Sequence, residues 1–131
     1  MQQAHYGTVD LAEAAKTLAR SRKVAAALRQ ELGEEDGKLA IALMLTGSLE
    51  GDLGDRVHDF LIDAIRNEAK VVWDGEIPGS EFAYPVNVNS YGGVFFVWAM
   101  EYDPVGYFLS RSDAVSYIKF NWDGVKGRVC K

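Results

Sequence analysis

The sequence predicts an α+β fold in which an antiparallel β-meander packs with about three helices. The strongest indication is the stretch 84–109, where β-branched and aromatic residues are interrupted by turn sequences at 90–93 and 103–106. The second is the richness of 10–32 in Ala, Leu, Glu, Lys and Arg, which are good helix formers. The third is a broad apolar face at helical spacing within 55–70.

The length and composition favour one folded domain. A chain of 131 residues with 48% hydrophobic and 25% charged residues is typical of a single globular domain. A chain of this size can bury enough surface to fold without a metal ion or a disulfide. We therefore expect a single domain over 1–131, with residues 1–8 mobile, and we expect no cofactor and no metal ion.

The charge and the cysteine content narrow the class of partner. The net charge of -5 argues against a nucleic-acid partner, because phosphate backbones require clustered Lys and Arg. Cys130 is the one cysteine, so no internal disulfide can form, which favours a reducing compartment. The longest apolar run, 39–45, is far too short to span a bilayer. These features predict a soluble, cytoplasmic protein with no membrane partner.

The first third of the chain contains one predicted helix and one segment that fits either a strand or a helix. Asp10 and Glu13 fit a capping box at the start of a helix over 10–32, and the sequence at 21–23 leaves open a break into two shorter helices. A polar turn is expected at 33–38. Large and small residues alternate over 39–46, which favours a buried strand, although a buried helix has a similar composition.

The middle of the chain leads into the meander. A glycine-rich connector at 46–55 precedes the helix 55–70, which has acidic residues at its start and basic residues at its end. A strand begins at 71–73 and is expected to end at Asp74-Gly75, followed by a turn at 77–80. Both faces of the strand over 94–102 are apolar, so this strand is predicted to be central in the sheet and covered on both sides.

The C-terminal segment has two interpretations. Ser110 and Ser112 are N-cap candidates for a helix that ends near Asn121. Alternation over 117–122 is the competing indication of a strand. Asp123-Gly124 is a turn signal, and it leaves open a short C-terminal strand.

The aromatic residues of the meander form the leading candidate surface. A sheet that is apolar on both faces needs two covers, so a face without helices would bind a ligand or a second copy of the chain. Tyr and Trp suit such a surface because each combines a large apolar area with a polar group. The candidate surface comprises Tyr84, Tyr91, Phe95, Trp98, Glu101, Tyr102 and Tyr107.

This surface favours a small non-enzymatic binding or regulatory protein. Its expected partner is another protein or a second copy of itself, as in a homodimer, and a small-molecule ligand remains open. An accessory protein of a mobile element, such as an inhibitor or immunity protein, would fit this description.

The glycine-rich connector supports an alternative function. Backbone N–H groups of a glycine loop at a helix start can bind phosphate, which would make the protein a small enzyme or a nucleotide binder that uses the Gly47–Asp55 loop. The residues of this alternative site are Thr46, Gly47, Ser48, Gly51, Asp52 and His58. A histidine at the edge of an apolar helix face, as at 58, is more often a packed residue than a catalytic base. Asp55, Asp59 and Asp63 share a helical face, which is more typical of a solvated surface than of a cation site.

Overall fold

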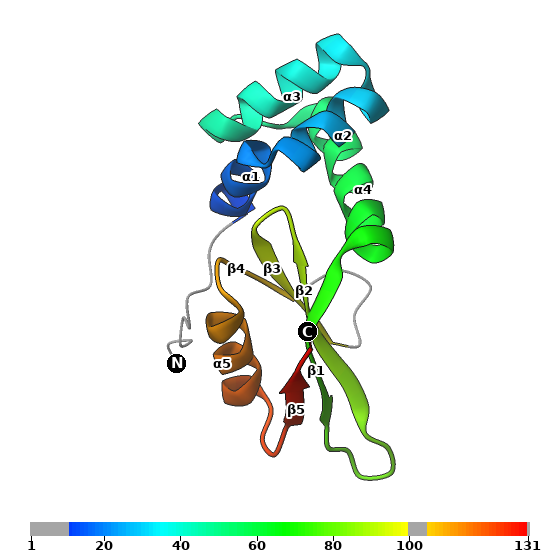
Figure 1. The fold of residues 1–131 in the computed structure, drawn as a ribbon, viewed down its shortest axis with the longest axis vertical. Coiled ribbons are helices and arrows are strands. Elements are labelled where there is room, and N and C mark those ends of the chain that lie inside the picture. The colour runs from blue at the N-terminus through cyan, green and yellow to red at the C-terminus, as the bar shows by residue number, and fades with distance from the viewer. Residues whose placement is uncertain (1–10, 100–104, 131) are drawn as a thin grey trace. The chain divides into compact units, whose positions relative to one another are not determined.

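The computed structural model describes residues 11–99 and 105–130, and these form a mixed α and β structure (Figure 1). Five helices and one five-stranded antiparallel sheet are present in this part of the chain, which confirms the α+β class and exceeds the three helices expected. The Asp10 cap, the mobility of 1–8, Glu101 and Tyr102 lie outside the described residues.

The described residues divide into two compact units. The helical unit contains residues 11–69 together with the turn 91–93, and the sheet unit contains the described residues of 70–90 and 94–130. The single domain expected from the sequence stays a prediction. None of the helices in the described part of the chain is both long and apolar enough to cross a membrane.

The first two helices are separated by one residue. Helix α1 spans Leu11–Arg20 and α2 spans Arg22–Leu32. Ser21 between them is extended, and its hydroxyl accepts a hydrogen bond from the backbone N–H of Val24 at 3.3 Å. This is an N-cap, which satisfies one of the free N–H groups at the start of α2. The break expected at 21–23 is therefore confirmed.

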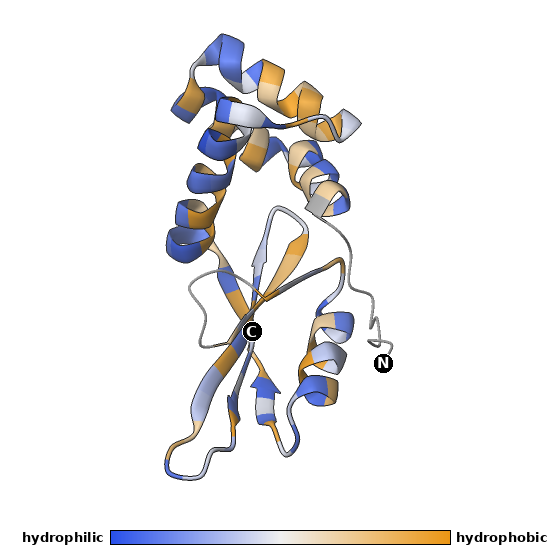
Figure 2. Cartoon of the chain, turned by 180° about the vertical axis from the view of Figure 1, so that it is seen from behind, coloured by the Kyte–Doolittle hydropathy of each residue, from blue (hydrophilic) through white to orange (hydrophobic). Residues whose placement is uncertain are grey.

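Helix α3 spans Glu34–Thr46, so the turn predicted at 33–38 and the strand favoured at 39–46 are both wrong. The acidic residues of 34–36 occupy the first helical turn, where the helix dipole favours negative charge. The buried positions Gly37, Ala40 and Met44 recur at a helical spacing of three or four. Other apolar residues of α3 lie outside this buried stripe, among them Leu39, which is 51% exposed. Figure 2 shows that several turns of α3 are hydrophobic.

Helix α4 spans Gly51–Glu68 and therefore begins four residues before the predicted start at 55 and ends two before 70. Its buried residues are Val57, Ala64 and Ile65.

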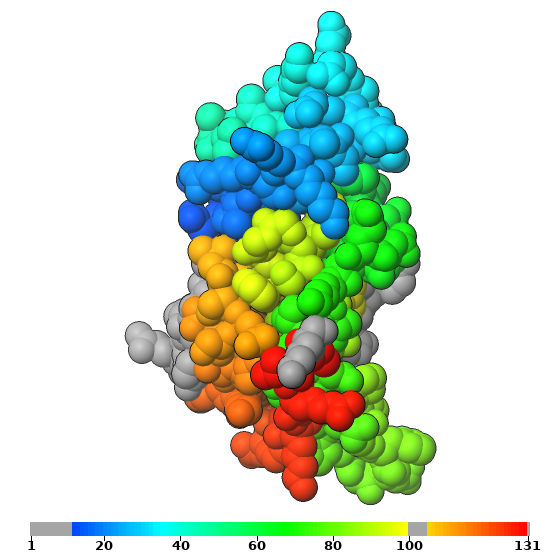
Figure 3. Space-filling model, viewed as in Figure 1, coloured from blue at the N-terminus to red at the C-terminus, as the bar shows by residue number. Residues whose placement is uncertain are grey.

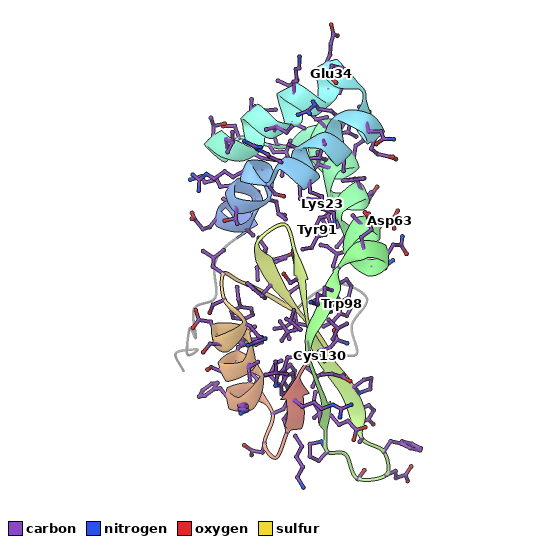
Figure 4. The ribbon with its side chains drawn as sticks, viewed as in Figure 1. Lys23, Glu34, Asp63, Tyr91, Trp98 and Cys130 are labelled. Atoms are coloured by element: carbon purple, nitrogen blue, oxygen red, sulfur yellow. The ribbon has the colours of Figure 1, made fainter. Side chains whose placement is uncertain are left out.

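The turn 91–93 packs within the helical unit. Gly92 has a φ of 58°, and a side chain here would meet Val24 Cγ2 at 2.7 Å and Leu18 Cδ2 at 2.9 Å. Tyr91 is 3% exposed, and Lys23 Nζ lies 5.5 Å from the centre of its ring (Figure 4). Both the backbone conformation and the close contacts require glycine at position 92.

The sheet has the strand order β4-β3-β2-β1-β5. Its strands are β1 (Lys70–Ile77), β2 (Tyr84–Tyr91), β3 (Val94–Ala99), β4 (Gly106–Phe108) and β5 (Lys126–Val129). The short C-terminal strand is confirmed. It pairs with β1, which continues through Asp74-Gly75 instead of ending there. The strand that begins at 94 is an interior strand, as predicted, because β3 lies between β4 and β2 and all six of its residues are buried or half-buried. Because β5 adds a strand beyond β1, the middle strand of the five is β2.

Helix α5 (Arg111–Asn121) packs on one face of the sheet. The hydroxyl of Ser110 accepts a hydrogen bond from the backbone N–H of Asp113 at 3.1 Å, so Ser110 rather than Ser112 is the N-cap. Ala114 and Ile118 are fully buried and point into the core of the sheet unit. The sheet contributes to this core Trp73, Ile77, Val86, Val88, Val97, Ala99 and Phe108.

Trp73 determines where glycine occurs in the neighbouring strand positions. A Cβ at Gly127 would lie 2.2 Å from Trp73 Cζ2, and one at Gly75 would lie 2.6 Å from Trp73 Cη2. The indole ring therefore covers the backbone of β1 and β5 at these two residues. Glycine inside a strand often marks such a close approach.

Candidate functional site

The aromatic residues predicted to form one surface are distributed over both faces of the sheet. Phe95 lies on the face covered by α5, where it packs against the buried core. Trp98 alternates with Val97 and so lies on the opposite face, half-buried (Figure 4). Tyr107 makes an edge-to-face contact with Phe96, with 5.7 Å between the ring centres. The strand residues therefore divide between the two faces.

The other two described aromatic candidates, Tyr84 and Tyr91, differ from each other in burial. Tyr84 begins β2 and is 42% exposed, whereas Tyr91 is buried in the helical unit. The Tyr91 hydroxyl is buried and has no hydrogen-bond partner among the described residues. Burial raises the pKa of Tyr91 above its ordinary value of 10.0, and the nearby carboxylate of Glu68 raises it further. Tyr91 therefore acts as a packed core residue in this structure.

The glycine-rich connector uses its backbone amides to end α3. The N–H of Ser48 donates to the carbonyl of Leu43 at 2.8 Å, and the N–H of Gly47 donates to the carbonyl of Met44 at 3.3 Å. Gly47 is left-handed with a φ of 71°, and this is the usual geometry of a helix C-cap. The Thr46 hydroxyl also donates to carbonyls of the last turn. These hydrogen bonds occupy the two amides that a phosphate would need at this end of the loop.

The polar residues that follow on α4 are exposed. Gly51 and Asp52 form the first turn of α4, and Asp52 is acidic, which disfavours an anion there. His58 is also exposed, and its Nδ1 lies 3.8 Å from Asp59 Oδ1. Within the described residues, no three His, Cys, Asp or Glu side chains lie close enough together to hold a metal ion. The nucleotide-binding function stays a prediction that this geometry does not favour.

A groove of about 840 Å³ lies between α5 and β5 in the sheet unit. Figure 3 shows the surfaces of α5 (orange) and β5 (red) next to each other on one face of the molecule. Its lining combines apolar side chains of β1, β3 and α5 with two serines and two basic residues of α5. Val129 adds an apolar side chain that is 54% exposed. The lining residues are Val72, Trp73, Phe95, Arg111, Ser112, Val115, Ser116, Lys119, Gly127, Arg128 and Val129.

The charged residues that line this groove are all basic. Arg111 and Lys119 project from α5, and Arg128 borders the groove from β5, although it alternates with Val129 and its side chain points to the other face of the sheet. In the described part of the chain, none of these three side chains forms an ion pair. The positive charges of Arg111 and Lys119, next to apolar side chains of the lining, attract an anionic group that also has apolar atoms to bury.

A second, shallower cavity of about 460 Å³ lies at the other face of the same strands. Val129 is opposite Trp73 in the β1–β5 ladder and therefore shares the face covered by α5. Arg128 and Lys126 alternate with Val129, so they point to the other face, opposite Asp74 and Glu76 of β1. The strand β5 is thus bordered by basic side chains on both faces.

The patterns in the sequence do not single out this groove. The available signal was the segment Lys126-Gly127-Arg128-Val129, in which basic residues alternate with small or apolar ones after a turn. The contribution of Arg111 and Lys119 became visible only once α5 was placed beside β5. Comparisons of the chain with protein-family models, curated proteins and solved structures found no match.

Proposed function

We propose that the protein is a non-enzymatic binding protein that holds an anionic segment of a partner protein at β5. The observation that carries this proposal is a set of basic side chains around β5 that form no ion pair with any described residue. Arg111 and Lys119 border one face of the strand, and Lys126 and Arg128 border the other. Acidic residues of a bound segment would therefore meet a cation on either face of the strand.

A protein segment fits this site better than a nucleic acid. The lining of the groove includes the apolar side chains of Val72, Phe95 and Val115, which can pack against aliphatic side chains of a bound segment. The net charge of -5 also repels a long polyanion, whereas a short acidic segment experiences mainly the nearby cations. A regulatory role as an accessory protein of a mobile element is compatible with such binding. The homodimer and the aromatic strand surface stay predictions.

A short synthetic peptide tests this proposal. The probe is a ten-residue peptide, capped at both ends, in which glutamate alternates with valine or threonine. We expect it to bind the full chain in calorimetric titration and to bind about tenfold more weakly to the Arg111→Glu/Lys119→Glu variant, which reverses two favourable charges. Raising the salt from about 50 mM to about 300 mM weakens the binding as well, because these charges are exposed.

A control variant, a lysine peptide and an oligodeoxythymidine show whether binding depends on the basic residues near β5 and on an acidic peptide. Arg20→Glu/Arg22→Glu changes the net charge equally at exposed positions of the helical unit, and it should leave the affinity unchanged. A peptide with lysine in place of glutamate should not bind. Equal affinity for the lysine peptide, tighter binding of a ten-residue oligodeoxythymidine, or no binding of the glutamate peptide at millimolar concentration would each overturn the proposal.

A further inference from the structure

The hydrogen bonds of β5 leave one side of this strand available. β5 is the last strand in the order β4-β3-β2-β1-β5, and among the described residues it pairs with β1 alone. The N–H of Cys130 donates to the carbonyl of Val72 at 3.0 Å. In an antiparallel ladder, alternate residues direct their N–H and C=O groups to the same neighbour. Arg128 therefore faces β1, whereas Gly127 and Val129 direct their backbone groups to the outer edge.

The outer edge of β5 lacks most of the features that commonly block edge strands. Its four residues are all exposed, they include no proline, and their register with β1 is regular. The protection that remains is charge, because Lys126 and Arg128 are basic. Such protection acts against a partner strand of the same charge and not against an acidic strand.

The positive charges of Lys126 and Arg128 favour an acidic segment over a second copy of β5 at this edge. A second copy of β5 in antiparallel pairing centred on Gly127 would place Lys126 opposite Arg128 of the other copy, and pairing centred on Arg128 would place arginine opposite arginine. Like charges directly opposite each other destabilise a strand pair. An acidic segment would instead complete a row of alternating charge, because Asp74 and Glu76 already lie opposite Arg128 and Lys126 on β1.

We propose that the partner binds as a sixth strand, in which an acidic extended segment pairs its backbone with Gly127 and Val129 of β5. This inference rests on the proposed function and specifies how the segment is held. Backbone pairing gives such a complex its affinity, and side chains on alternate positions give it specificity. Side chains of the segment on the α5 face point toward Arg111 and Lys119, and those on the other face point toward Lys126 and Arg128.

Methylation of backbone nitrogens in the same glutamate peptide tests the pairing. One peptide carries N-methyl groups at alternate residues, and a second carries the same number at the intervening residues. Only one of these two sets of N–H groups can face β5, so one peptide should lose about tenfold or more in affinity while the other binds like the unmodified peptide. A matching signal is slower amide hydrogen exchange at Gly127 and Val129, but not at Arg128, in the complex.

The outcomes separate this inference from the proposed function. If both methylated peptides bind as the unmodified one does, and Arg111→Glu/Lys119→Glu still weakens binding, the sixth strand is wrong and the anionic site stands. If both lose affinity equally while exchange at Gly127 and Val129 is unchanged, the sixth strand is also wrong. If the unmodified peptide does not bind, the proposed function fails and the sixth strand fails with it.

Discussion

An indole ring covers glycine backbone in the sheet unit, whereas two helix backbones meet at a glycine in the helical unit. Trp73 lies against Gly75 and Gly127, and a Cβ at Gly37 of α3 would lie 2.5 Å from the Cα of Arg29 on α2. The first contact lets one large side chain fill the space between α5 and the sheet. The second lets α2 and α3 approach closely without any large side chain. Glycine therefore enables close packing in both units, through a side chain in one and through the backbone in the other.

The two units also differ in how their charges are paired. In the helical unit, Glu34 lies within ion-pair distance of both Arg29 and Lys38, and Arg56 pairs with Asp36 at 3.1 Å. A cavity of about 600 Å³ there is lined by Arg56 and by four acidic residues, Glu31, Asp59, Asp63 and Glu68. The basic residues of the groove beside α5 form no such pair with any residue that the structure describes. Among the described residues, Arg29, Lys38 and Arg56 of the helical unit therefore lie within ion-pair distance of carboxylates, whereas Arg111, Lys119 and Arg128 of the sheet unit do not.

Replacement of Trp73 should have the largest effect on stability. Trp73→Ala removes a side chain that is 3% exposed and leaves a cavity above two glycines, so we expect a loss of about 3–5 kcal/mol in the free energy of unfolding. Urea denaturation followed by circular dichroism measures this loss. Phe82→Ala, at a residue that is 67% exposed, should change the same quantity by less than about 0.5 kcal/mol. Similar losses in the two variants would contradict the role assigned to Trp73.

Two glycine-to-alanine changes compare a helix position in contact with another backbone, Gly37, with a helix position that has room for a side chain, Gly54. Gly37→Ala gains helix propensity but forces a Cβ against the backbone of α2, so we expect a net loss of about 1–3 kcal/mol. Gly54→Ala on α4 is the matched control, because the nearest atom to its Cβ is 3.8 Å away. The control should stabilise the protein by about 0.5–1 kcal/mol. Stabilisation by both changes in thermal denaturation would show that α2 and α3 do not meet at Gly37.

Removal of the Tyr91 hydroxyl should have a small effect of opposite sign. Tyr91→Phe deletes a buried oxygen that has no hydrogen-bond partner in the described part of the chain, so the stability at neutral pH should be unchanged or higher by up to about 1 kcal/mol. Tyr84→Phe is the matched control, because the residue is exposed. A clear loss of stability in Tyr91→Phe, measured by urea denaturation, would mean that the hydroxyl has a partner in solution.

The same variant changes the response to alkaline pH. The pKa of Tyr91 is raised above 10.0 in the folded protein, so the folded state keeps this proton more tightly than the unfolded state does. The resulting stability is present below pH 10 and is lost as the pH rises through the folded pKa. Stability curves between about pH 9 and pH 11 should therefore fall less steeply in Tyr91→Phe than in the unchanged protein. Parallel curves would exclude this contribution.

The smallest expected change in stability distinguishes Arg56, which forms an ion pair, from Arg111, which forms none with the described residues. Arg56→Gln breaks an exposed ion pair with Asp36 and should cost less than about 1 kcal/mol. Arg111→Gln should leave the free energy of unfolding unchanged, because Arg111 has no ion pair within the described residues. Calorimetric unfolding of the two variants measures this difference. A larger loss of unfolding free energy in Arg111→Gln than in Arg56→Gln would show that Arg111 stabilises the sheet unit, and this would contradict its proposed role in binding.

Local sequence patterns predicted much of the secondary structure correctly. The extended Ser21 between two helices, the Ser110 cap and the strands of the meander all follow from side-chain chemistry that acts within a few residues. The segment 39–46 was mispredicted because its alternation of large and small residues fits a strand, while its burial follows the helical positions Ala40 and Met44. Which residues of this segment are buried depends on α1 and α2, which pack against α3.

The sequence by itself determined the α+β class, most of the elements and the aromatic content of the meander. The tertiary structure decided which face of β3 meets α5, and so divided Phe95 from Trp98. It also placed β5 at the edge of the sheet and brought Arg111 and Lys119 beside it. The physical reason is that propensity and periodicity act within one element, whereas strand order and the unpaired charge around β5 depend on which distant elements pack together.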